Sequence, residues 1–356
     1  MQRIGLIIVP GVIAIALFVG INSFDTLSNE ADAPITSSSL DFSAYSEGIN
    51  TVLYDSQGNV NYTLQAQRQV HYNDDSTELE KPFIRLYQNG DSRWNIAANS
   101  GRIPAAETSA DGTVEKIELL GDVQVYSLDE FGNRMLMSTE FLTLNPESEI
   151  LETDQPVSVV ISALRLSSIG MTAKLRTDEI TFLREIRGTS PSMIVLIITL
   201  GYLSTTSSFS LEADKDQELL VSADGGSRMS IVGDNRLMEM SDNVIITRGS
   251  MEIRGDTATI ETVMSSGEVS KVTVVGTPVY YQQQLDSSDE PVKGSSNSIT
   301  FYTDESDGAT IVELVGEAVI ESPTSNFKCS AITYIAELDL MRDSQGPCSG
   351  EFNTSN

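Results

Sequence analysis

Apolar and polar residues alternate along most of this chain, in a sequence unit that is repeated several times. In the complete copies a small residue and an acid, at Gly121-Asp122, Ser241-Asp242 and Gly316-Glu317, open an alternating run. A second alternating run follows, interrupted near its middle by small or charged residues such as Arg254-Gly255-Asp256. Alternation predicts a strand with one buried and one wet face. The interruption predicts a corner at which the chain bends into the next stretch of sheet.

The alternating runs continue from 49 to 187 and from 215 to 340, separated by turn signals and without a good helical stretch. Long strands that have no helices to cover them must bury their apolar face against another sheet. The sequence therefore predicts an all-β protein with two β domains, at 49–187 and 215–340. A polar tether over 23–48 precedes them and a polar tail over 341–356 follows.

An apolar segment at the N-terminus predicts a membrane anchor. Ile4 to Ile21 is a run of 18 residues without a charge, preceded by Arg3. A helix of that length rises about 27 Å, close to the roughly 30 Å hydrocarbon core of a bilayer. We expect an uncleaved single-pass anchor over 1–22, with the remaining chain outside the cytoplasm because the cationic flank is N-terminal. A cleaved signal peptide is the alternative.

A second apolar segment, Met193–Leu203, lies inside the predicted linker 188–214. Its eleven residues are too few to span a bilayer as a helix. It has the form of the apolar region of a signal peptide, with a cleavage position near Ser210. The segment therefore indicates that two secreted proteins are joined here, and the product is one polypeptide or two. A buried strand is the other interpretation.

Composition excludes several classes of function. The chain has 51 acidic and 22 basic residues, a formal net charge of −29. This charge argues against binding to nucleic acid and against docking flat on an anionic membrane surface. It has one histidine, His71, so neither a His-based triad nor a multi-His metal site can form within it. Motifs for nucleophilic serine, zinc-binding helices and phosphate loops are missing from the sequence. We expect no enzyme, no cofactor and no metal.

The second half resembles LptA, the periplasmic lipopolysaccharide transport family. The matching features, in order, are Gly276-x-Pro278, Pro291-Val292-x-Gly294, Ile299-x-Phe301 and Leu314-x-Gly316. The stretches KDQELLVSAD (215–224) and DNVIITRGSMEIRGDTATIE (242–261) match the first strands of the same family. The resemblance covers nearly all of 211–340, and we assign it to 193–356.

The first half resembles LptC, the membrane-anchored partner family in the same system. After the apolar N-terminus come LYDSQGNVNYTLQA (53–66), RWNIAAN (93–99), LLGDVQVYSL (119–128) and SSIGMTAKLRTDEITFLREIR (167–187). This resemblance covers 1–188. The two families are normally separate chains, whereas here they are joined.

The resemblance implies two open, V-shaped β-jelly rolls of the OstA-like type, in tandem. It implies a periplasmic carrier that holds the acyl chains of lipopolysaccharide in a continuous groove, between an inner-membrane ABC transporter and the outer-membrane translocon. Implied partners are lipopolysaccharide, the permease subunits of that transporter, an LptD-type outer-membrane protein, and further copies added edge to edge. A structural or adhesive β protein of the envelope and a carrier of another lipid are the alternatives.

Every second residue of a strand points to the same face, and this parity selects candidate groove residues. Each candidate could equally be an ordinary core residue that contacts no ligand. For example, Leu219 and Val221 should face inward and Leu220 outward, and a one-residue insertion would reverse the set. The candidates are Tyr62, Leu64, Ile96, Val123, Val125, Leu142, Ile180, Phe182, Leu219, Val221, Met251, Ile253, Tyr281, Ile299, Phe301 and Ile320.

Two further expectations concern the second half. An oxidising periplasm permits a disulfide between Cys329 and Cys348, with a buried free thiol as the alternative. The last strand of the first domain, around Thr177–Arg184, is expected to pair with the first strand of the second, around Glu218–Ala223. That pairing would align Ile180 and Phe182 with Leu219 and Val221.

Overall fold

The computed structural model is all-β, as the alternation predicts. It describes residues 42–352 apart from 191–213, 215–216 and short gaps at 56, 89, 106, 110–111, 115, 129–131, 286–287, 305 and 307. The chain divides into two units, Met1–Ser43 and Ala44–Asn356. The second unit contains both of the predicted β domains.

The first half contributes thirteen strands. They are β1 (Phe42–Tyr54), β2 (Val60–Tyr72), β3 (Thr77–Glu80), β4 (Phe83–Gln88), β5 (Asp91–Ala97), β6 (Ser100–Ile103), β7 (Glu107–Ser109), β8 (Gly112–Val114), β9 (Ile117–Leu128), β10 (Arg134–Asn145), β11 (Ile150–Ile161), β12 (Leu164–Lys174) and β13 (Glu179–Ser190).

The second half contributes ten strands and one short 3-10 helix. They are β14 (Leu219–Ala223), β15 (Ser227–Val232), β16 (Asn235–Arg248), β17 (Met251–Val263), β18 (Val269–Leu285), β19 (Ser288–Thr303), β20 (Thr310–Ser322), β21 (Ser325–Ile335), η1 (Ala336–Leu338), β22 (Leu340–Gln345) and β23 (Ser349–Phe352).

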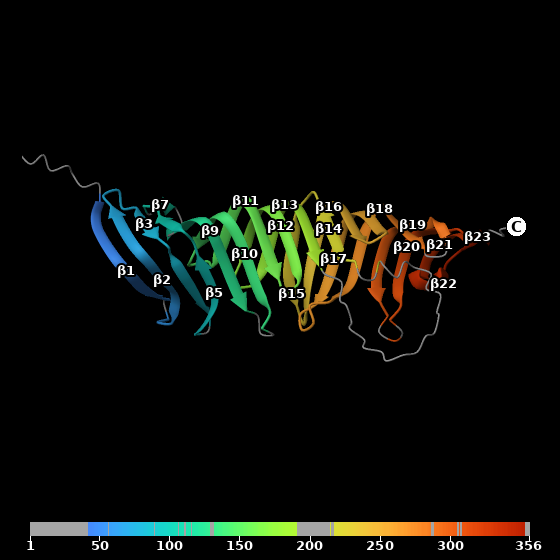
Figure 1. Cartoon of the computed structure of the whole chain (residues 1–356), viewed down its shortest axis with the longest axis horizontal. Helices are drawn as coiled ribbons and strands as arrows, with labels where there is room; N and C mark the ends of the chain where they lie inside the picture. The colour runs from blue at the N-terminus through green and yellow to red at the C-terminus, as the bar shows by residue number, and fades with distance from the viewer. Residues whose placement is uncertain are drawn as a thin grey trace, which may run out of the picture. The chain divides into compact units, whose positions relative to one another are not determined.

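Antiparallel pairing between successive long strands joins 21 strands into one sheet, while β7 and β8 form a separate hairpin. Figure 1 shows the long strands β9 to β13 and β16 to β21 following one another in chain order. Because β13 of the first half pairs with β14 and β15 of the second, both halves belong to a single ladder. The structure therefore does not separate them into two compact domains.

The predicted corner is present as a line of register shifts across the ladder. The pairing of β9 with β10 shifts between Thr139 and Phe141, and that of β16 with β17 shifts between Ser241 and Val244. An extra residue on one strand bends it and re-aims the chain. The small-plus-acid pairs lie at these shifts, inside β9, β16 and β20, instead of opening a strand as the sequence suggested.

The corner line divides the sheet into two walls. Wall A contains β3, β6, residues 117–120, 141–145, 150–153, 171–174 and 179–182 of β9–β13, β15, residues 235–241, 257–263, 269–275, 298–303, 310–315 and 331–335 of β16–β21, and β22. Wall B contains β4, β5, residues 123–128, 134–139, 157–161, 164–168 and 186–190 of β9–β13, β14, residues 244–248, 251–254, 279–285, 288–296, 318–322 and 325–329 of β16–β21, and β23. The inner faces of both walls form one hydrophobic core.

The two halves are joined through β13, as predicted, but in a different register. Residues Ile186–Ser190 of β13 pair with β14, in wall B. In wall A, Ile180 and Phe182 pair with Met229 and Ser227 of β15, not with Leu219 and Val221. The predicted register is therefore wrong. The physical reason is that β13 crosses the corner line, so its two ends need two different partner strands.

Several predicted boundaries differ from the observed elements. Strand β1 begins at Phe42, inside the predicted tether, and β13 continues to Ser190, inside the predicted linker. The predicted polar tail contains β22 and β23. The predicted anchor and Met193–Leu203 lie outside the described residues. In the part of the chain that the structure describes, no helix is long and apolar enough to cross a membrane.

Candidate functional site

The residues that parity selects are buried on the inner faces of the two walls. Each of the 16 is at most 8% exposed. Residues 62–65 of β2 pair with β4 and therefore also belong to wall B. Wall A supplies Leu142, Ile180, Phe182, Ile299 and Phe301, and wall B supplies Tyr62, Leu64, Ile96, Val123, Val125, Leu219, Val221, Met251, Ile253, Tyr281 and Ile320.

The direction of the alternation at the start of β14 is confirmed. Leu219 is 8% exposed and Val221 is 6% exposed, whereas Leu220 between them is 45% exposed. On β19 the same alternation buries Ile299 and Phe301 and leaves Thr300 half-buried. The alternation in the sequence therefore identified which face of these strands is buried.

The inner faces pack against each other instead of leaving an open groove. One continuous apolar cluster extends from Tyr62 to Ala336 and crosses the joint between β13 and β14. At that joint, Leu164, Leu219 and Val221 of wall B and Met229 and Met238 of wall A are among the residues around a cavity of about 20 Å³. A cavity of that size holds roughly one water molecule. The structure thus shows a packed, mostly apolar interior between the two walls, in which Ser190, Arg236 and Thr262 also line the small cavity at the joint.

Polar contacts join the free edges of the walls. Arg93, near the start of β5 in wall B, forms an ion pair with Asp178, in the turn from β12 to β13 of wall A. Burial raises the pKa of the Asp178 carboxyl, and the positive charges of Arg93 and of the buried Arg236 oppose this shift. The desolvation of the carboxylate is therefore the larger effect here, because Asp178 is mostly withdrawn from water.

Two more contacts link turns of opposite walls. The Asn133 side-chain amide donates to the carbonyl oxygen of Met264 at 2.9 Å. The Thr324 hydroxyl donates to the Asp339 carboxylate at 3.1 Å. These contacts are single hydrogen bonds at exposed or half-buried positions, each of which contributes about 1 kcal/mol. They are weak compared with the apolar contact beneath them.

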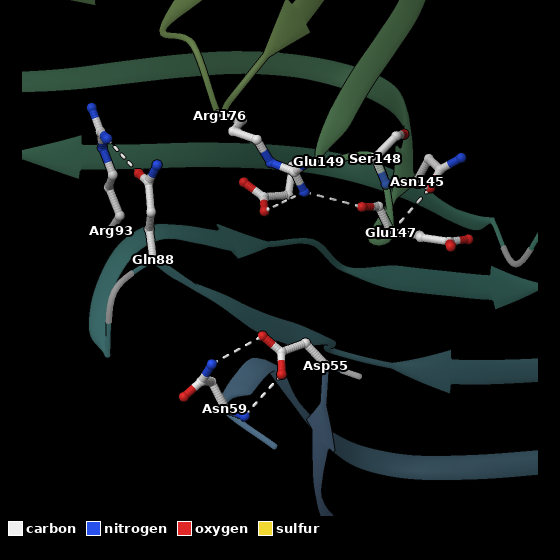
Figure 2. A network of polar contacts seen from close by, with 9 residues as sticks. All are labelled: Asp55, Asn59, Gln88, Arg93, Asn145, Glu147, Ser148, Glu149 and Arg176. Atoms are coloured by element: carbon white, nitrogen blue, oxygen red, sulfur yellow. Dashed lines mark hydrogen bonds and ion pairs between the residues drawn. The ribbon is translucent and has the colours of Figure 1, made fainter. Parts of the chain in front are cut away.

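Neighbouring turns on one rim also hold each other in place. Figure 2 shows Arg176, from the turn between β12 and β13, donating to the Glu149 carboxylate at 3.0 Å and to the Glu147 carbonyl oxygen at 3.3 Å. In the turn between β1 and β2, the backbone amide of Asn59 donates to Asp55 at 2.9 Å. Such contacts fix the turns of each wall at its free edge.

Parity could have extended the candidate set, because other inward residues obey the same rule. Trp94, two positions before Ile96, is 3% exposed, and Met238 and Ile260 lie beside the joint. Trp94 Nε1 and Ser227 Oγ are the buried side-chain polar atoms without a hydrogen-bond partner within the described residues. The Arg93–Asp178 contact gave no sequence signal, because its partners are 85 positions apart.

No group with catalytic geometry is found in the described residues. His71 Nδ1 lies 2.9 Å from Thr77 Oγ1, a contact within the hairpin of β2 and β3 that fits a structural role. Within the same residues, no three His, Cys, Asp or Glu side chains gather as a metal site would require.

A disulfide joins Cys329, at the corner of β21, to Cys348, between β22 and β23. Strand β21 pairs with β22 on one side of this corner and with β23 on the other. The disulfide therefore ties the last strands of the chain to the edge of the ladder.

Comparison with known proteins places family matches on both halves. Residues 11–190, which are 180 of the 356, match the family described as lipopolysaccharide-assembly, LptC-related. Residues 227–338 match the family described as LptA/(LptD N-terminal domain) LPS transport protein. The two matches lie on either side of the joint between β13 and β14, as the two resemblances in the sequence predict.

Individual relatives match the second type of domain. The chain is 29% identical over 141 residues to the lipopolysaccharide export system protein LptA of Haemophilus influenzae, covering 39% of this chain and 77% of the relative. It is 24% identical over 139 residues to the lipopolysaccharide export system protein LptH of Pseudomonas aeruginosa, covering 39% and 75%. The crystal structure of that LptH covers 39% of this chain and 96% of its own, with 19% identity and a TM-score of 0.33.

Proposed function

Because this chain belongs to the LptC-related lipopolysaccharide-assembly family and continues into an LptA/LptD N-terminal transport domain, we propose that its interior carries the acyl chains of lipopolysaccharide across the periplasm. One observation supports this most directly. The apolar cluster between walls A and B extends from Tyr62 to Ala336 without a break at the joint of the two halves. A lipid could therefore pass from one half to the other without its acyl chains entering water.

The driving force for holding such a lipid is the burial of its acyl chains. Each CH₂ group removed from water contributes about 0.8 kcal/mol. Several acyl chains cannot cross water unaided, whereas the saccharide is best left in water at the free edges of the walls. Transport of this kind breaks no covalent bond in the protein or the lipid, so it requires no catalytic residue.

The walls must separate to admit an acyl chain, because the interior is closed. The two walls are segments of the same strands, joined through the backbone at the corner line. At their free edges they are joined by contacts such as Arg93–Asp178 and Asn133–Met264. Replacing contacts between apolar side chains by contacts with acyl chains keeps those side chains out of water. Opening about the corner is therefore the movement that we propose.

In this proposal the two ends of the ladder have different partners. Strand β1 lies at one end of the ladder and β22 with β23 at the other, and unpaired strand edges can accept a strand of another protein. The N-terminal end is assigned to the permease subunits of the inner-membrane ABC transporter, with residues 1–22 as the anchor. The C-terminal end is assigned to an LptD-type protein or another copy of the chain.

A structural β protein without a ligand is the second candidate, and the packed interior is the observation that favours it. A pair of matched substitutions on β19 separates the two. Phe301→Asp places a carboxylate on the inner face, and Thr300→Asp places one on the half-buried neighbouring position. Burying an unpaired carboxylate among acyl chains is strongly unfavourable.

We expect Phe301→Asp to abolish co-purification of lipopolysaccharide with the full chain, and Thr300→Asp to leave it within about twofold of wild type. Circular dichroism of both variants checks that the sheet is retained. Equal capture by both variants, with the sheet retained, would contradict the proposed function.

A further inference from the structure

The outer face of wall B is hollowed at the joint between the two halves. Side chains of β11, β12, β13, β14 and β16 surround a concavity of about 570 Å³. Its outward-pointing polar side chains include Arg165, Ser167, Arg187, Thr189 and Ser222. Ser158, Thr247 and the apolar Leu220 and Ile245 are also among the residues that line it.

The strand register arranges these side chains as two rows across the joint. In one row Ser167 of β12 pairs with Arg187 of β13, which pairs with Ser222 of β14. In the next row Arg165 pairs with Thr189, which pairs with Leu220. Arg165 and Arg187 therefore occupy diagonal positions on adjacent strands, where the backbone positions of the two residues are about 7–8 Å apart. Thr189 lies opposite Arg165 and Ser167 lies opposite Arg187, so each arginine has a hydroxyl beside it.

The charge of this concavity is opposite to that of the chain. No acidic residue is among those that line it, although the chain has 51 acids and 22 bases. Within the described residues the side chains of Arg165 and Arg187 take part in no ion pair or hydrogen bond. Elsewhere on the sheet, Arg228 and Arg254 are paired with Glu179 and Glu252. Two arginine side chains without a partner among the described residues thus face the same recess.

The side chains present favour a phosphate attached to a saccharide. A guanidinium offers a planar fork of donors that matches the oxygens of a phosphate. Ser and Thr hydroxyls both donate and accept hydrogen bonds, as the hydroxyl groups of a saccharide require of their partners. A free inorganic phosphate would use the arginines and leave most of the 570 Å³ unfilled.

The concavity lies directly behind the closed cavity at the joint. Val221 contributes to the walls of both, and the pair Ser190 and Leu219, which lines the inner cavity, is one residue from the outward pair Thr189 and Leu220. One residue along a strand is about 3.3 Å. A lipid held between the walls could thus fold its saccharide over this rim of wall B.

From these observations we infer that Arg165 and Arg187 bind the phosphorylated saccharide of the lipid whose acyl chains occupy the interior. The inference rests on the proposed function for the acyl chains, but the saccharide site itself can be tested without them. The outer face of wall B at the joint is thereby assigned to binding the phosphorylated saccharide of the lipid.

The test uses the full chain and a deacylated, phosphorylated lipopolysaccharide saccharide as the soluble probe. The double variant Arg165→Gln/Arg187→Gln removes both charges from the concavity. Arg184→Gln is the matched control, because Arg184 is an exposed arginine of β13 outside the concavity. We expect the double variant to weaken binding of the probe about tenfold or more, and Arg184→Gln to leave it unchanged.

Removing the phosphates from the probe should have the same effect on wild type as the double variant has on the intact probe. Equal binding by wild type and the double variant would overturn the inference. So would competition by inorganic phosphate or by a short acidic peptide at the concentration at which the saccharide binds. Capture of the acylated lipid by Phe301→Asp is measured in parallel, so failure at the saccharide site is distinguished from failure of the interior.

Discussion

Residues at the corner line adopt backbone conformations that few side chains favour. Gly316 has a φ of 82° and Glu317 a φ of 51°, both in the left-handed region. A side chain in that region costs about 1–2 kcal/mol, unless the residue is glycine. The chain therefore accepts local strain at Glu317 to bend β20 from wall A into wall B. A carboxylate at this exposed position keeps the corner in water.

This strain predicts opposite effects at two neighbouring positions. Glu317→Gly relieves the backbone strain and should raise the free energy of unfolding by about 1 kcal/mol. Gly316→Ala should lower it by at least that amount, because a Cβ there would lie 2.8 Å from Asn297 Nδ2. Urea unfolding of both variants measures the two changes. A stabilising Gly316→Ala would contradict the assigned corner geometry.

Asp178 provides a pH-dependent contact between the walls. Burial raises the pKa of its carboxyl, so the native state binds more protons than the unfolded state between the two pKa values. The contribution of Asp178 to stability is therefore largest at low pH and is lost as pH rises through the native pKa. We expect the free energy of unfolding of wild type, relative to Asp178→Asn, to increase from about pH 7 to about pH 4. A difference that is independent of pH would contradict this prediction.

The elements that join the two halves show what alternation can and cannot predict. The repeated unit predicted the strands, the inner face and the participation of β13 in the joint. It could not give the register, because pairing across the joint depends on how β13 crosses the corner line and meets both β14 and β15. A period of two residues specifies a face but not a partner.

The joint should hold without a covalent connection. Strand β13 has five paired residues with β14 and three with β15, and the apolar core continues beneath them. We expect the halves to remain associated at micromolar concentration after cleavage at a protease site placed near Ser207. Val221→Asp, on the inner face, should then separate the halves, whereas Leu220→Asp should not. Size-exclusion chromatography of the cleaved protein is the measurement.

Dissociation of the cleaved wild-type halves at micromolar concentration would show that the covalent connection alone holds the two parts together. Retention of the Val221→Asp halves would show instead that the buried face of β14 contributes little to the joint. Either result would contradict the contribution of the ladder and the shared core.

At the scale of the whole molecule, the sequence predicted an all-β chain with one apolar face shared by two related halves. The resemblance to LptA and LptC implied an open trough, whereas alternation reports only which side of a strand is apolar and not what that side contacts. In the structure Leu219, Met229 and Met238 are among the side chains that meet across the two walls, and the interior is closed. The saccharide concavity also escaped prediction, since Arg165 and Arg187 are brought together by pairing between strands.

The central claim is that the interior of both halves holds acyl chains. Site-specific photo-crosslinking to lipopolysaccharide tests it most directly, with the crosslinking residue placed in the full chain at Phe182, Val221 or Phe301 on the inner face. Leu183 and Leu220, which are 46% and 45% exposed neighbours on the outer face, are the matched controls. The account predicts crosslinks at all three inner positions and at neither control. Equal crosslinking at inner and outer positions, or crosslinks at the controls alone, would contradict it.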